Sequence, residues 1–123
     1  MLTIQLDANA GIATLTPQGE LSEGDFESAA QVIDPYLEKH DLLNGIIIHV
    51  ASFPGWETFA SMLAHVKFVK AHHKKIACVA IVTDSLLGNV AEKIAGHFVN
   101  AEIKHFAFDE FETAKQWITN NPV

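Results

Sequence analysis

The sequence predicts an α/β fold, a single domain over residues 1–123 that is built on a mainly parallel sheet. Three observations support this prediction. Apolar segments typical of strands alternate with segments whose apolar residues recur at helical spacing. Residues 76–82 form an unbroken apolar run, which is typical of a parallel strand buried on both faces. A chain of 123 residues is long enough for one hydrophobic core and too short for two.

The chain begins with a predicted hairpin followed by a helix. Residues 2–6 and residues 12–16 read as strands, and the Asp, Asn and Gly residues between them predict a turn. Ser22–Asp25 resembles a capping box, and apolar residues at helical spacing extend the predicted helix to Leu37. Pro35 lies inside this repeat. Because proline has no backbone N–H, we expect it to kink or divide the helix.

Three further strand–helix pairs complete the predicted order ββαβαβαβα, with no repeat or linker. The predicted strands cover residues 43–50, 76–83 and 101–106. The predicted helices run from Trp56 to about residue 72, through residues 90–98, and from an acidic cap at residues 109–112 onward. In the last helix, the spacing predicts burial of Phe111, Ala114, Trp117 and Ile118. Strands that alternate with helices favour a mainly parallel sheet.

Composition narrows the classes of function. The net charge is −7 and none of the eight basic residues is arginine, which disfavours phosphate clamps and nucleic-acid binding. No apolar run approaches the roughly 18–20 residues of a membrane span, and the N-terminus lacks a secretory pattern. Cys78 has no partner for an internal disulfide and reads as inert core. We therefore expect a cytoplasmic protein.

Five segments carry a resemblance to a known family: Pro54–Trp56, Phe68–His73, Ile76–Asp84, Ala101–Phe106 and Ala114–Ile118. With this order of elements, the chain resembles the SpoIIAA-like family, a branch of the STAS-type α/β domains. The resemblance implies a SpoIIAA/STAS-like fold over nearly the whole chain. These segments are typical of the family, and they contain no catalytic motif.

The resemblance implies two classes of function. SpoIIAA-like domains are similar in fold to CRAL-TRIO lipid carriers, which implies an apolar or lipid-like ligand and contact with a membrane surface. STAS proteins also act as regulatory interaction modules of the anti-sigma-factor-antagonist kind. In the sporulation branch, a serine in an Asp-Ser-Ser loop is phosphorylated. Here the matching loop, residues 52–58, lacks that motif.

The predicted ligand site lies where the strands end, because open α/β sheets bind ligands outside the carboxyl ends of their strands. Its predicted members are His49, Ser52, Phe53, Trp56, Thr83, Asp84 and Leu87. Trp56 would add apolar area with one polar atom, which suits an amphipathic ligand.

The same edge contains the residue types of a catalytic triad, Ser52, His49 and Asp84, which would make the protein a small hydrolase. The sequence has no Gly-x-Ser-x-Gly elbow to impose that geometry. The more favoured alternative is structural: Asp84 or Ser85 caps the next helix, and Ser52 bonds the loop backbone. We therefore predict no catalytic residue and no enzyme activity.

The helix that starts at Trp56 has apolar residues on two sides, so we expect a second covered surface. A neighbouring helix, a homodimer partner and a ligand are the alternatives, and we expect the protein to form a homodimer. Several lysines near its end fit either the helix dipole or anionic lipid at the inner membrane surface. The predicted interface residues are His65, Lys67, Phe68, Lys70, His72 and Lys74. The seven histidines lack the spacing of a zinc site, so we predict no metal and no cofactor.

Overall fold

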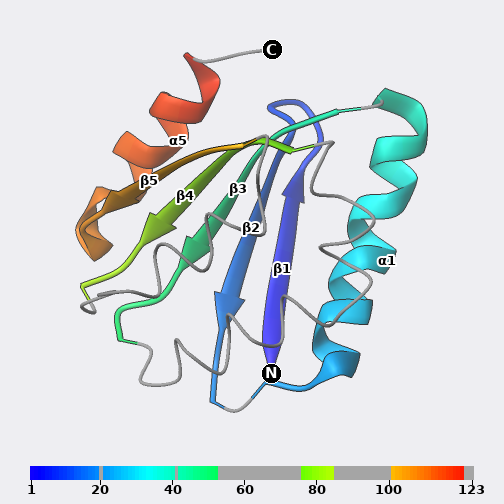
Figure 1. The fold of residues 1–123 in the computed structure, drawn as a ribbon, viewed down its shortest axis with the longest axis horizontal. Coiled ribbons are helices and arrows are strands. Elements are labelled where there is room, and N and C mark those ends of the chain that lie inside the picture. The colour runs from blue at the N-terminus through cyan, green and yellow to red at the C-terminus, as the bar shows by residue number, and fades with distance from the viewer. Residues whose placement is uncertain (20, 41, 53–75, 85–100, 121–123) are drawn as a thin grey trace.

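The computed structural model describes residues 1–19, 21–40, 42–52, 76–84 and 101–120. Its centre is a five-stranded sheet in the order β1-β2-β3-β4-β5 (Figure 1). β1 and β2 form an antiparallel hairpin, and the other neighbouring pairs are parallel. The strands are β1 (Leu2–Asp7), β2 (Ile12–Pro17), β3 (Leu43–His49), β4 (Ile76–Val82) and β5 (Glu102–Phe106). The α/β class, the mainly parallel sheet and the N-terminal hairpin are confirmed. The two helices predicted after β3 and β4 lie outside the described residues.

Local side-chain contacts shape the hairpin turn. The Asp7 carboxylate accepts hydrogen bonds from the backbone N–H groups of Asn9 and Ala10, both at 3.1 Å. Gly11 then adopts a φ of 69°, a left-handed conformation that favours glycine. The Asn44 side chain donates to the Ala10 carbonyl at 2.8 Å and so ties the turn to β3. The turn is therefore held both by its own aspartate and by the neighbouring strand.

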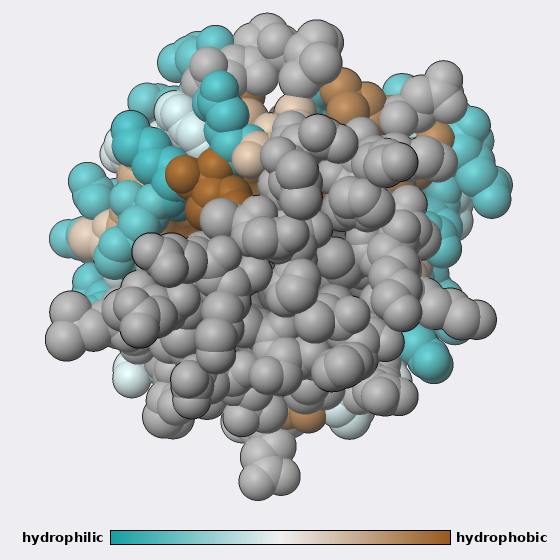
Figure 2. Space-filling model, viewed as in Figure 1, coloured by the Kyte–Doolittle hydropathy of each residue, from teal (hydrophilic) through white to brown (hydrophobic). Residues whose placement is uncertain are grey.

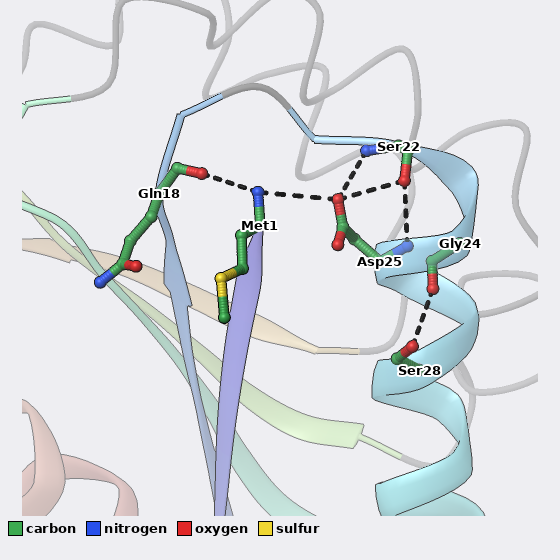
Figure 3. A network of polar contacts seen from close by, with 6 residues as sticks. All are labelled: Met1, Gln18, Ser22, Gly24, Asp25 and Ser28. Atoms are coloured by element: carbon green, nitrogen blue, oxygen red, sulfur yellow. Dashed lines mark hydrogen bonds and ion pairs between the residues drawn. The ribbon is translucent and has the colours of Figure 1, made fainter.

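Helix α1 (Glu23–His40) begins with the predicted capping box (Figure 3). The Ser22 N–H donates to the Asp25 carboxylate at 2.8 Å, and the Asp25 N–H donates to the Ser22 hydroxyl at 3.4 Å. The Met1 amino group lies 3.8 Å from the same carboxylate. The helix runs without interruption past Pro35, so the expectation that this proline divides the helix is wrong. A single missing backbone donor is tolerated because α1 packs along its length on the sheet.

The sheet separates two hydrophobic cores, one under each described α-helix, which corrects the expectation of a single core. α1 packs on one face through Phe26, Ile33 and Leu37. α5 (Phe111–Thr119), which follows the short 3₁₀ turn η1 (Phe108–Glu110), packs on the other face through Ala114 and Ile118. β3 contributes to both cores, because successive strand side chains point to opposite faces. Its residues Ile46 and Ile48 lie in the α1 core, and Ile47 lies in the α5 core.

Helix α5 approaches the sheet closely at Gly45. A Cβ atom at this position would lie 2.6 Å from Cγ2 of Ile118, so a side chain there would collide with the helix. The prediction for α5 is confirmed for Ala114 and Ile118, which are fully buried. Phe111 and Trp117 are only partly buried, which corrects the expectation that they belong to the core interior. Helical spacing identifies the inward face of α5, but it does not locate the rim of that face.

The remaining surface features follow from this arrangement. In the view of Figure 2, the described side chains at the rim are mainly hydrophilic, and apolar ones show as small separate patches. Cys78 is buried in the α5 core, as predicted. Within the described residues, no helix combines the length and the apolar character that crossing a membrane requires.

Candidate functional site

The ends of β3, β4 and β5, with the residues that follow them, form one continuous edge. We name residues 49–52, 83–84 and 106–111 the carboxyl edge. Backbone hydrogen bonds continue the sheet here beyond the strands. The Val50 N–H donates to the Val82 carbonyl at 3.1 Å, and the Asp84 N–H donates to the Ala51 carbonyl at 3.2 Å. The predicted residues His49, Ser52, Thr83 and Asp84 all lie at this edge.

His49, at the end of the central strand, packs against two phenyl rings. Its imidazole stacks on Phe108 with 4.6 Å between ring centroids and 17° between ring planes. Phe111 lies 4.7 Å away at 36°. We name these three residues the His49 cluster. The ring is half-buried, and its nitrogens make no hydrogen bond within the part of the chain that the structure describes.

Asp84 is exposed, and one of its carboxylate oxygens accepts the Phe108 N–H at 3.0 Å. Asp84 therefore holds the turn before α5; any cap on the helix predicted after it falls outside the described residues. The start of α5 does not have the acidic cap that the sequence predicted. Glu110 makes no side-chain hydrogen bond to the start of α5, and its carboxylate instead accepts the Ala107 N–H at 2.8 Å.

Thr83 is fully buried, unlike its neighbour Asp84. Its hydroxyl donates to the Ala51 carbonyl at 3.4 Å, and its own carbonyl lies 2.9 Å from Nε2 of His105. This carbonyl accepts the bond, so Nε2 of His105 carries the proton. Thr83 thus ties the ends of β3, β4 and β5 together from inside the edge.

Ser52, His49 and Asp84 do not form a catalytic triad. Among the described residues, no hydrogen bond joins Ser52, His49 and Asp84. The imidazole faces two phenyl rings, the Asp84 carboxylate bonds a backbone N–H, and Ser52 is exposed to solvent. A serine nucleophile needs a base within hydrogen-bond reach and a third group to orient that base. Neither relation is present here.

Several predicted residues lie outside the described part of the chain. These are Phe53, Trp56 and Leu87 of the ligand site, and the interface residues His65, Lys67, Phe68, Lys70, His72 and Lys74. Across residues 1–19, 21–40, 42–52, 76–84 and 101–120, no group of three or more histidine, cysteine or acidic side chains is placed to hold a metal.

The sequence reasoning missed Phe108 and Phe111. Both follow β5, the last strand of the parallel set. Since every strand end of a parallel set meets the same edge, aromatic residues after the last strand were a usable signal.

The chain was also compared with known proteins. The family model described as SpoIIAA-like matches residues 12–119. The match begins at the first residue of β2 and ends at the last residue of α5, so it contains the whole carboxyl edge. No curated protein and no solved structure gives a significant match.

Proposed function

This chain belongs to the SpoIIAA-like family, and from that premise we propose that it is a non-enzymatic module that binds an apolar, lipid-like ligand at its carboxyl edge. SpoIIAA-like domains are STAS-type regulatory and interaction domains and are generally non-enzymatic. The observation on which the proposal rests is the His49 cluster, an imidazole in contact with two phenyl rings at the end of the central strand.

The composition of the carboxyl edge suits an amphipathic molecule. The ring of Phe111 supplies apolar contact area, and the His49 nitrogens offer a donor and an acceptor. The exposed hydroxyl of Ser52 lies just beyond the end of the same strand as His49. Ligand sites commonly combine an apolar lining with a few polar groups that fix orientation. The edge provides both kinds of group.

Fluorescence titration with cis-parinaric acid, a polyene fatty acid, tests this proposal. We expect His49→Ala to weaken binding about tenfold, because one ring contact and one hydrogen bond are lost. The matched control is His40→Ala, since His40 also stacks on an aromatic ring, Tyr36, but belongs to α1. Equal affinity in wild type and His49→Ala would remove the carboxyl edge from the binding site.

The hydrolase alternative is tested with p-nitrophenyl esters. The proposal expects no hydrolysis above background. A hydrolysis rate that disappears in Ser52→Ala would contradict the non-enzymatic assignment. The expected outcome is supported by the contacts of two of these groups, since the Asp84 carboxylate accepts a backbone N–H and the His49 ring packs on two phenyl rings.

We also propose a peripheral contact with anionic membranes through Lys67, Lys70 and Lys74, as their spacing in the sequence suggests. Sedimentation with phosphatidylcholine vesicles, with and without phosphatidylglycerol, measures it. Substituting the three lysines by glutamate should abolish the dependence on anionic lipid. The control places the same charge change at Lys39, Lys104 and Lys115. Equal sedimentation of both triple variants would exclude this surface.

A second candidate function is regulatory protein binding, which the family match itself favours. Native mass spectrometry of the purified protein separates the two functions. A retained small molecule supports ligand carriage, whereas a co-purifying protein without a small molecule supports the regulatory function. The same spectrum reports the subunit count and tests the expected homodimer.

A further inference from the structure

We propose that Phe108 is an autoinhibitory side chain that closes the carboxyl edge by occupying the surface of His49. The inference rests on the proposed function and adds the regulation of that same site. It starts from a difference between the two phenyl rings of the His49 cluster, which belong to segments that are anchored very differently.

Phe111 is the first residue of α5, whose Ala114 and Ile118 are fully buried in the core. Its ring is tilted by 36° against the imidazole. Phe108 belongs to η1, a turn of three residues of which none is buried. Its ring is nearly parallel to the imidazole, at 17°, and covers one face of it. The better stacked ring thus lies on the less anchored segment.

Among the described residues, two contacts join Phe108 to other parts of the carboxyl edge, and the Ala107–Glu110 hydrogen bonds close the turn itself. One is the ring stack on His49, and the other is the 3.0 Å hydrogen bond from its N–H to the exposed Asp84 carboxylate. The turn is bounded by two fixed points, Phe106 on β5 and Ala114 on α5, which are both buried. Phe108 can therefore leave His49 while the strand before it and the helix after it stay packed.

A ligand chain that packs on the covered face of His49 must first displace Phe108. An aromatic stack and one hydrogen bond together correspond to a factor of about ten to a hundred in an equilibrium constant. A site that is open only in that small fraction of molecules binds its ligand more weakly by the same factor. The wild-type edge is thus a closed form of the site.

Removing the contact should increase affinity, which a merely structural ring would not do. We expect Phe108→Ala to bind cis-parinaric acid about tenfold more tightly than wild type. Asp84→Ala, which keeps the ring and removes the acceptor of its N–H, should increase affinity about fivefold. The Phe108→Ala/His49→Ala double variant should lose the gain. Tyr36→Ala is the matched control, because it removes a ring that stacks on His40, away from the edge.

The outcomes separate this inference from the proposed function. Affinity that falls in His49→Ala but does not rise in Phe108→Ala and Asp84→Ala overturns the autoinhibitory role alone. Absence of binding in wild type and in Phe108→Ala alike overturns the proposed function. An equal gain in Tyr36→Ala and Phe108→Ala also overturns the inference, because it would report general exposure of apolar surface.

Discussion

Two aspartates show how single carboxylates organise this chain by accepting backbone N–H groups. Asp84 holds the turn before α5, and Asp25 closes the capping box of α1. The hydrogen bond from the Ser22 backbone is the main reason that the pKa of Asp25 lies below its ordinary value of 3.8. The nearby amino group of Met1 acts in the same direction, whereas desolvation opposes it. The Asp25 carboxylate therefore stabilises the folded state as an anion.

Replacing Asp25 by alanine should lower the free energy of unfolding by about 1 kcal/mol at neutral pH, as expected for a lost helix cap. Because the pKa of Asp25 is lowered on folding, its contribution is complete above 3.8 and disappears as the pH falls through the lower folded pKa. Urea unfolding of both proteins across the acidic range measures this difference. Glu27→Ala, an exposed carboxylate on the same helix, is the control. A difference between wild type and Asp25→Ala that does not change with pH would contradict the ionic role of Asp25.

At the scale of elements, the position of α5 depends on one missing side chain. Gly45 of β3 lets Ile118 approach so closely that even a methyl group would overlap it. The carboxyl edge depends on the same approach, because α5 begins with Phe111 of the His49 cluster. Packing at the far end of the helix and the geometry of the edge are therefore linked through α5.

Gly45→Ala should reduce the free energy of unfolding by about 1–3 kcal/mol, since extra volume in a packed core displaces its neighbours. Adding Ile118→Ala should recover part of that loss, and thermal or urea unfolding of the four proteins of the double-mutant cycle measures the coupling. Gly24→Ala is the control, because the nearest described atom to a Cβ there is the Ser22 hydroxyl oxygen, at an ordinary contact distance of 3.6 Å. Strictly additive effects of the Gly45 and Ile118 substitutions would show that the two positions do not interact.

At the scale of the whole molecule, two cores share one sheet, and Cys78 reports on the core beneath α5. Cys78 is 3% exposed, and burial, with a smaller effect from the Glu102 carboxylate, raises the pKa of its thiol. Both effects slow alkylation, because only an accessible thiolate reacts. The reactivity of Cys78 therefore measures how often the core that contains Ala114 and Ile118 of α5 opens.

Iodoacetamide should label Cys78 of the native protein more than about a thousandfold more slowly than that of the urea-unfolded protein, given typical domain stabilities. If α5 detaches only when the whole domain unfolds, Gly45→Ala should speed labelling by the factor that its unfolding free energy predicts. A larger acceleration would identify α5 as a unit that opens by itself. Labelling of native wild type at the unfolded rate would contradict the burial of Cys78.

Features that depend on neighbouring residues were predictable from the sequence. The capping box of α1 lies within four residues. The unbroken apolar run of β4 is by itself typical of a buried strand. Pro35 was expected to kink or divide α1, and the division is wrong, because local backbone chemistry was weighed without the packing of α1 on the sheet. The positions of the strand ends at the carboxyl edge were predictable, because the carboxyl ends of parallel strands lie at the same edge of a sheet.

By itself, the sequence determined the α/β class, the hairpin and the ends of the strands, since strand and helix periods are properties of short segments. Only the tertiary structure decided what the polar groups at those ends do. Asp84 meets Phe108 across 24 positions of the chain, and His49 meets Phe111, because β5 brings η1 and α5 back to the end of β3. Such contacts join residues that share no local pattern, so they arise only when the sheet has been assembled.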